Sequence, residues 1–266
     1  MRMLRPTLGW LFAATLATPA AAVDHGPWDA LLARHVRWNA QGTATAVDYA
    51  GFAAERARLD AYLDDLAAVS PDAFGRWPAP ARMAFLINAY NAATVALVLT
   101  RYPELGSIKE LGSLLRSPWK RRFVDLLGAR RSLDDIEHEL LRGAPDFAEP
   151  RIHFAVNCAS LGCPALRPEA YVAERLEAQL ADQTRRFLRD RNRLADGSLW
   201  LSPLFDWYAG DFRAHGGGLA AFLERHAEAL ELDADARRDL HRGRLRIRHL
   251  PYDWALNDRP ITEALP

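Results

Sequence analysis

Two cysteines are the residues of this chain with the clearest potential for covalent chemistry. Cys158 and Cys163 are the only cysteines in the sequence, and four residues lie between them. A cysteine that follows an apolar segment can act as a nucleophile when a base lies within hydrogen-bond reach. Two cysteines this close can also form a structural disulfide, a redox-active pair or, with two histidines, a zinc site. The spacing leaves all four interpretations open, and it favours the disulfide and the nucleophile.

Two histidines are candidates for the base that a nucleophilic Cys158 would need. Residues 151–157 are predicted to form a buried strand that ends at Cys158. Because side chains alternate along a strand, His153 would lie on the opposite face and reach the thiol only where the strand twists or bulges. His138 follows Asp134 by one turn of a predicted short helix, so that carboxylate can orient its imidazole. Either histidine could serve as the base, and His249, near the end of the last predicted strand, is a third candidate.

A long apolar segment places two asparagines where polar side chains are rare. Residues 81–101 are predicted to form a helix that is apolar on nearly all sides and is therefore buried at the centre of the fold. Asn88 and Asn91 share one face of this helix. A buried amide without a partner costs about 1–3 kcal/mol, so each asparagine needs one. Backbone groups are the favoured partners, while the alternative makes Asn88 a polar stabiliser in a catalytic site.

Other polar and aromatic residues near these motifs are candidates for ligand binding. Asp206 and Asp211 lie beside aromatic residues on a predicted helix. Such carboxylates can orient a histidine or line a sugar-like cleft, but they more often cap a helix or bind an indole N–H. The predicted binding residues are Tyr90, Asn91, Asn157, Ser160, Asp253 and Trp254.

The elements that must position these residues indicate an α+β fold in which helix predominates. Residues 132–135 resemble a capping box that opens the helix of His138. We expect one domain over residues 23–266, with a small, mostly antiparallel sheet packed on the central buried helix. Periodicity and turn residues predict further helices over 28–38, 52–66, 168–189, 203–212 and from 219, a hairpin over 123–133, and extended segments over 199–202 and 245–250.

The first 22 residues have the features of a signal peptide. Arg2 and Arg5 precede a short apolar run, and Ala20 to Ala22 fit a signal-peptidase site. Cleavage there would leave a chain from Val23 with a formal charge of −2, because the removed segment carries two arginines and no acids. We therefore expect a periplasmic or secreted protein, without stable membrane insertion after cleavage.

The composition and the missing motifs exclude several classes of function. The 34 basic and 34 acidic residues balance, whereas a nucleic-acid partner usually requires a basic surplus. A Gly-rich phosphate loop, a Gly-x-Ser-x-Gly elbow and a His-Glu-x-x-His helix are all missing from the sequence. We expect no cofactor, no bound metal and no nucleic-acid partner.

Five motifs follow one another along the chain: 85–92 (FLINAYNA), 133–138 (LDDIEH), 151–158 (RIHFAVNC), 162–164 (GCP) and 252–257 (YDWALN). In this order they resemble a known family, labelled domain of unknown function 547 (DUF547). The resemblance spans roughly residues 81–257, most of the mature chain, and Leu86 stands where many relatives have tryptophan. The resemblance implies a shared fold and pocket without an established activity. A distant similarity to papain-like or transglutaminase-like folds is a further implication, although there the nucleophilic cysteine opens the central helix.

The leading functional hypothesis is a thiol-dependent hydrolase or acyltransferase that acts on a peptide-like or amide substrate. Cys158 would be the nucleophile, His138 or His153 the base, and Glu137 or Asp134 the group that orients it. One alternative is a non-enzymatic binding module for a small-molecule or peptide-like ligand, in which a Cys158–Cys163 disulfide clamps a recognition loop. The other alternative is a redox-active dithiol protein.

Overall fold

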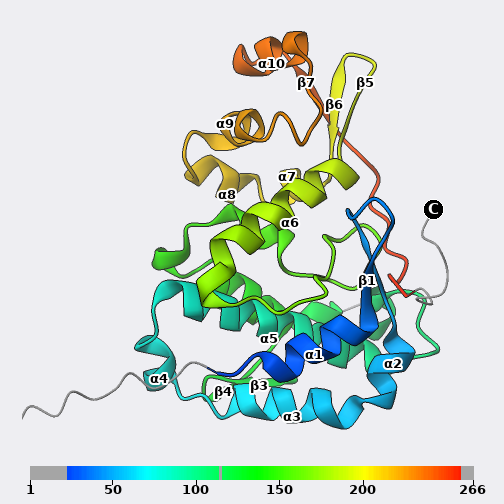
Figure 1. Ribbon diagram of the computed structural model, residues 1–266, viewed down its shortest axis with the longest axis vertical. Coiled ribbons are helices and arrows are strands. Elements are labelled where there is room, and N and C mark those ends of the chain that lie inside the picture. The colour runs from blue at the N-terminus through cyan, green and yellow to red at the C-terminus, as the bar shows by residue number, and fades with distance from the viewer. Residues whose placement is uncertain (1–22, 114–115, 259–266) are drawn as a thin grey trace, which may run out of the picture.

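One long helix organises the protein, of which the computed structural model describes residues 23–113 and 116–258 (Figure 1). This helix, α5 (Ala79–Leu99), is buried almost without interruption from Ala81 to Val98. Within the described residues it is the one helix long and apolar enough to span a membrane, yet 89% of its most apolar window lies inside the protein. It is therefore the core helix that the sequence predicts. The predicted signal peptide, residues 1–22, lies outside the described residues.

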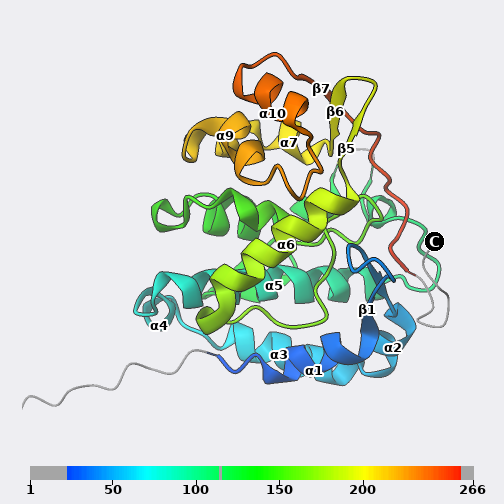
Figure 2. The same ribbon diagram turned by 45° about the horizontal axis from the view of Figure 1, so that its top comes forward.

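Helices from the N-terminal third cover one side of α5, and a later helix crosses its other side (Figures 1 and 2). The crossing helix, α6 (Leu176–Asp190), places Leu176 and Leu180 in the main core. The covering helices are α1 (Gly26–His35), α2 (Tyr49–Ala54) and α3 (Arg56–Ala67), and α4 (Pro71–Gly75) leads into α5.

A second apolar cluster lies in the C-terminal part of the chain. Its centre is a group of stacked and tilted phenylalanine rings, among them Phe154, Phe205 and Phe212. Phe187 near the end of α6 also belongs to it, so α6 joins both clusters. The surrounding helices are α7 (Leu204–Trp207), α8 (Ala209–Ala214), α9 (Gly218–Arg225) and α10 (Ala234–His241).

The strands of the described residues form three small sheets. The first two are antiparallel hairpins, and in the third β6 pairs antiparallel with β5 and parallel with β7. The helix-rich α+β class is confirmed, but the β structure is divided where one sheet was expected, because strands of three or four residues pair mainly with their neighbours in sequence. The strands are β1 (Val36–Trp38), β2 (Thr45–Val47), β3 (Val124–Leu126), β4 (Ala129–Arg131), β5 (Arg193–Ala195), β6 (Ser198–Leu201) and β7 (Arg246–His249).

The predicted capping box is confirmed. The Ser132 hydroxyl accepts a hydrogen bond from the Asp135 N–H at 3.0 Å, and the Asp135 carboxylate accepts one from the Ser132 N–H at 2.9 Å. It opens η3 (Asp135–Leu141), which has the wider turns of a π-helix. Irregular helices of this kind often occur at functional sites.

The predicted strand over residues 151–157 is wrong. Residues Pro150–Phe154 form a 3₁₀ helix, η5, and the chain runs irregularly from there to Cys158. Pro150 at its start has the fixed φ that suits a first helical turn, and the Glu149 carboxylate caps the Arg151 N–H at 3.0 Å. A short apolar run cannot be distinguished from a buried helical turn by its pattern. The alternation argument that separated His153 from Cys158 is therefore invalid.

Several predicted helices are shorter or divided. The helix expected over 168–189 begins only at Leu176, because backbone groups of the preceding segment bind side chains elsewhere, as the Tyr171 N–H does with Asn88. The helix expected over 28–38 ends at His35, the one over 52–66 is broken at Glu55, and the one over 203–212 is broken at Tyr208.

Candidate functional site

Two asparagines of α5 bind the backbone on either side of the disulfide loop, Asn91 just before it and Asn88 after it. The Asn91 amide donates to the Ala155 carbonyl at 3.0 Å and accepts from the Asn157 N–H at 2.8 Å. The Asn88 amide binds both backbone groups of Tyr171 in the same manner, at 2.8 and 3.0 Å. The favoured interpretation of these asparagines, as partners of backbone groups, is therefore confirmed.

The two cysteines form a disulfide. The segment between them is closed by Asn157, whose amide donates to the Pro164 carbonyl at 2.7 Å and accepts from the Ala159 N–H at 2.9 Å. Because both sulfurs are bonded to each other, neither is a free thiol or an available zinc ligand in this structure.

The disulfide loop lies against the C-terminal segment of the chain. The Leu161 N–H donates to the Ala255 carbonyl and the Gly162 N–H donates to the Asp253 carbonyl, both at 2.8 Å. A Cβ at Gly162 would come within 2.9 Å of that carbonyl oxygen, so the close approach requires glycine. This contact brings Tyr252 and Trp254 beside the disulfide, although about 90 residues separate them from the two cysteines in the sequence.

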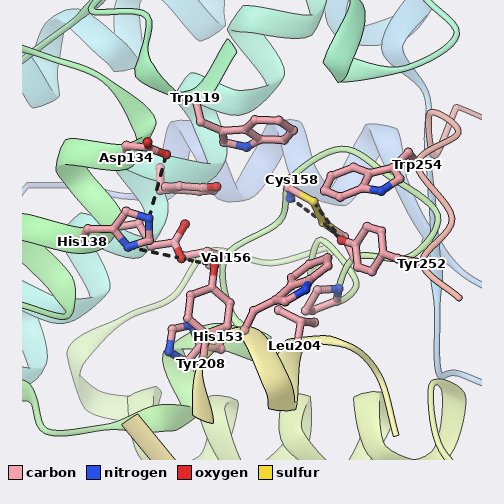
Figure 3. Close-up of a pocket in the computed structure, with 15 residues that line it drawn as sticks. Trp119, Asp134, His138, His153, Val156, Cys158, Leu204, Tyr208, Tyr252 and Trp254 are labelled. Atoms are coloured by element: carbon pink, nitrogen blue, oxygen red, sulfur yellow. Dashed lines mark hydrogen bonds and ion pairs between the residues drawn. A yellow bond between two sulfur atoms is a disulfide. The ribbon is translucent and has the colours of Figure 1, made fainter. Parts of the chain in front are cut away.

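A cavity of about 180 Å³ opens beside the disulfide (Figure 3). Its lining comes from six segments: α5, the 3₁₀ helix η2 (Pro118–Lys120), the start of η3, residues 153–164, residues 204–208 and the C-terminal segment. Cys158, which is partly exposed, and the more buried Cys163 both line it.

Acidic and imidazole groups from the start of η3 form one wall of the cavity. Figure 3 shows Asp134 and His138 on one side, with Tyr252 and Trp254 across from them. Glu137 is 5% exposed, and its carboxylate accepts a hydrogen bond from the Tyr208 hydroxyl at 2.6 Å. The His138 side chain is 42% exposed, and its Nε2 lies 4.0 Å from the Asp134 carboxylate.

Arg142 connects this wall to the second histidine. Its guanidinium donates to His138 Nδ1 at 2.8 Å and to both carboxylate oxygens of Asp211, at 2.7 and 2.9 Å. Since Nδ1 of His138 accepts, the proton of the neutral imidazole is on Nε2. His153 donates from Nε2 to the same Asp211 carboxylate at 2.7 Å and stacks on the Tyr208 ring at 3.7 Å. Asp211 thus orients a histidine, which was the less favoured interpretation of its position.

Burial and hydrogen bonds perturb several pKa values in this network. Burial lowers the pKa of His153 and raises that of Asp134. Hydrogen bonds from His153 and Arg142 hold the pKa of Asp211 well below its usual range. Burial raises the pKa of Tyr208, and the nearby Glu137 carboxylate raises it further, so its hydroxyl remains a donor at neutral pH.

Four aromatic rings form the opposite wall and rim. Trp254 contacts Tyr252, Trp119 and Trp207, with ring centroids 4.4, 5.8 and 5.9 Å away. The Tyr252 hydroxyl lies 3.2 Å from each sulfur of the disulfide, and the Ser160 hydroxyl lies 3.3 Å from Cys158 Sγ. Burial raises the pKa of Tyr252 to about 12, so it donates to the sulfurs at neutral pH.

The disulfide loop separates this cavity from a second one of about 280 Å³. Asn157, Ser160 and Asp253, all predicted binding residues, line the second cavity, as does Cys163. The Asp253 carboxylate is exposed and accepts from the Ala255 N–H at 2.9 Å. Asn157, Ser160 and Asp253 shape the loop and its C-terminal partner segment, and they are not part of the lining of the first cavity.

The structure brings together most of the predicted catalytic residues but not all. Cys158, His138, His153 and Glu137 line one cavity, with Tyr90 and Trp254 from the predicted binding set. Asn88 is fully buried on the backbone of Tyr171 and is not part of that lining, so the structure gives it no place as a polar stabiliser. Asn91 likewise serves the backbone.

Sequence reasoning missed several contributors to the site, among them Arg142 and Trp119. Arg142 is not among the predicted site residues. Its position four residues after His138 on the same predicted helix nevertheless indicates that the two side chains can meet. Trp119 lies in a short segment without periodicity, and no sequence signal connects it with Trp254. In the part of the chain that the structure describes, no group of three or more His, Cys, Asp or Glu side chains is arranged to hold a metal ion.

Comparison with known proteins identifies one domain. Residues 74–188 match the sequence profile of a family described as "Protein of unknown function, DUF547". The matched span contains α5, η3 and the disulfide loop, whereas Trp207, Tyr252 and Trp254 lie beyond it. Searches of curated proteins and of solved structures found no match to this chain.

Proposed function

We propose that the chain, whose residues 74–188 match the DUF547 family of unknown function, binds a small ligand in the aromatic cavity without transforming it. The Cys158–Cys163 disulfide acts as a clamp that fixes one wall. We further propose that the protein works after export, because a disulfide of this kind persists in oxidising compartments outside the cytoplasm.

One observation carries the proposal: Trp207 remains 48% exposed at the rim of the cavity, in contact with Tyr252 and Trp254. The burial of large aromatic side chains lowers the free energy of the system. A cluster of them that is left partly exposed therefore typically marks a binding surface. The cavity volume of about 180 Å³ exceeds the roughly 150 Å³ of an engineered cavity that holds benzene. It therefore suits a compact ligand or a single side chain.

The surroundings of Cys158 favour binding over acyl transfer. A nucleophilic thiol needs a base that can take its proton, but the polar neighbours of Cys158 Sγ are the hydroxyls of Ser160 and Tyr252. The two imidazoles of the cavity are bound elsewhere, to Arg142 and to Asp211. The hydrolase hypothesis thus lacks its catalytic pair in this arrangement.

Ligand-observed NMR on the oxidised, mature chain tests the proposal. A mixture of small neutral, anionic and cationic fragments is screened against the wild type and against Trp254→Leu. We expect some fragments to bind the wild type and to lose most of their signal in the variant, because Trp254 contacts the other rings of the wall. A screen in which every bound fragment is unaffected by Trp254→Leu contradicts binding in this cavity.

A redox function is the second candidate, because the partly exposed Cys158 faces the cavity while Cys163 is buried. A thiolate of a bound thiol compound would attack Cys158 Sγ, forming a mixed disulfide and releasing Cys163 as the thiolate. The Tyr252 hydroxyl, 3.2 Å from Cys163 Sγ, would stabilise that leaving group. Equilibration with glutathione buffers tests this: a bridge that opens under mildly reducing buffer supports a redox role, and a bridge that resists it supports a clamp.

A further inference from the structure

We propose that the ligand of the aromatic cavity is a small organic cation, such as a quaternary or tertiary ammonium group. This inference rests on the proposed binding function and adds the chemical class of the ligand. Two features carry it: the sign of the charges that line the cavity and the mutual tilt of its aromatic rings.

The charged side chains that line the cavity, Asp134 and Glu137, are both acidic. Glu137 is almost fully buried, and its one hydrogen-bond donor is the neutral hydroxyl of Tyr208. The imidazoles of His138 and His153 also face the cavity, and His153 favours its neutral form because burial lowers its pKa. Among the described residues, the ion-pair partner of the Glu137 carboxylate is the imidazole of His138, whose Nδ1 lies 3.9 Å away, and not a lysine or an arginine. A cation in the cavity would therefore meet a carboxylate that is free to interact with it.

Three of the four ring contacts in the aromatic wall are tilted, and the fourth, between Trp207 and Trp254, is nearly parallel at 20°. The ring of Tyr252 is inclined by 48° to that of Trp254 and by 47° to that of Trp207, and Trp119 is inclined by 66° to Trp254. Rings inclined in this way can present their faces from different directions, and we take them as an aromatic cage of the kind that recognises alkylammonium groups. A sugar ring stacks best on a flat platform, so this arrangement favours the cation.

The protein itself already places cations on two of the aromatic rings that line the cavity. Lys109 Nζ lies 3.8 Å from the centre of the Trp254 ring, and the guanidinium of Arg142 lies 5.1 Å from that of Tyr208. Neither basic residue is part of the cavity lining. These contacts show that the faces of both rings accept a positive charge in this environment.

The deciding experiment compares choline with 3,3-dimethylbutan-1-ol, a neutral molecule of nearly the same shape. Binding of each is measured by isothermal titration calorimetry and by tryptophan fluorescence, on the oxidised mature chain. We expect choline to bind about tenfold or more tightly than the neutral analogue, because the cage and the Glu137 carboxylate interact with the charge. Trp254→Leu should weaken the binding of choline by about tenfold.

Charge variants separate the carboxylate from the rings. Glu137→Gln should lower the affinity for choline about tenfold and leave that for the neutral analogue unchanged, since glutamine can still accept from Tyr208. Should this variant fail to fold, Asp134→Asn, at a partly exposed position, gives the same comparison with a smaller change. Asp206→Asn is the matched control, because Asp206 is an exposed acid beside Trp207 and outside the lining.

Each outcome decides a separate point. Equal affinities for choline and its neutral analogue overturn the cation inference and leave the binding proposal standing. Loss of choline binding in Asp206→Asn as large as in Glu137→Gln overturns it too, because the effect is then long-range. Absence of binding by either probe also overturns the cation inference, and the fragment screen then decides the proposed function independently.

Discussion

The polar side chains of α5 and those at the start of η3 make contrasting use of their hydrogen-bonding groups. Asn88 and Asn91 lie in a regular, fully buried helix, and every one of their amides binds backbone of another segment. Asp134 and His138 lie where the chain enters an irregular helix, and both are partly exposed to the cavity. Polar groups in the core make their hydrogen bonds to the backbone of the protein itself, whereas those at an irregular helix remain available to a ligand.

This difference has a physical basis. A polar atom buried without a partner costs about 1–3 kcal/mol, so a core position tolerates an asparagine only when backbone groups satisfy it. At a cavity wall, water or a ligand can supply the missing partner. The contrast therefore predicts large losses of stability for changes in α5 and small ones for changes at η3.

The largest effect is expected for Asn91→Leu. The change leaves the Ala155 carbonyl and the Asn157 N–H buried without partners, so the free energy of unfolding should fall by about 2–4 kcal/mol. Urea unfolding followed by circular dichroism measures it. A loss below about 0.5 kcal/mol would show that Asn91 does not hold the cysteine segment, and the comparison would fail.

Removal of the disulfide comes next. The double variant Cys158→Ser, Cys163→Ser should lose about 2 kcal/mol of stability, because the closed loop is short. The wild type unfolded in the presence of reductant serves as the control and should match the double variant. Alkylation of the native, oxidised protein should find no reactive thiol, and a thiol that reacts before reduction would contradict the clamp.

The pH dependence of stability reports on His153. Burial lowers its pKa in the folded state, so its contribution to stability is complete above the unfolded value of about 6.5 and is lost as the pH falls further. The Tm of the wild type should therefore drop between about pH 7 and 5 more steeply than that of His153→Gln. His25 and His226, whose pKa values are also lowered by burial, leave a residual slope in the variant.

An exposed histidine gives the control for that experiment. His241→Gln, at a position on α10 with a 78% exposed side chain, should keep the full slope of the wild type. Asp211 does not interfere in this window, because its pKa lies well below the usual range and its contribution is lost only below about pH 4. Equal slopes in wild type and His153→Gln would contradict a buried, neutral His153.

The smallest effect is expected for His138→Gln. Its side chain is 42% exposed and makes one hydrogen bond, with Arg142, so the free energy of unfolding should change by less than about 0.5 kcal/mol. Thermal unfolding of His138→Gln and of Asn91→Leu under the same conditions compares the loss of stability in the two regions directly. A loss as large as that of Asn91→Leu would make His138 a structural residue and would remove it from the candidate site.

The sequence by itself determined much of the local structure. The nearly continuous apolar pattern of α5 required a buried helix, and a buried helix required hydrogen-bond partners for Asn88 and Asn91. The Ser132–Asp135 capping box is local chemistry and was readable for the same reason. Two cysteines separated by four residues limited the disulfide to one pairing within the chain.

Only the tertiary structure decided what the site is made of. The run from Arg151 to Asn157 has no pattern that distinguishes a strand from a 3₁₀ turn, so the side of the chain on which His153 lies could not be derived. Contacts between Trp119, Trp207 and Trp254 join segments up to 135 residues apart, and no local propensity encodes such a meeting. Side-chain chemistry and short-range hydrogen bonds are properties of the sequence, but a cavity exists only after distant segments have packed together.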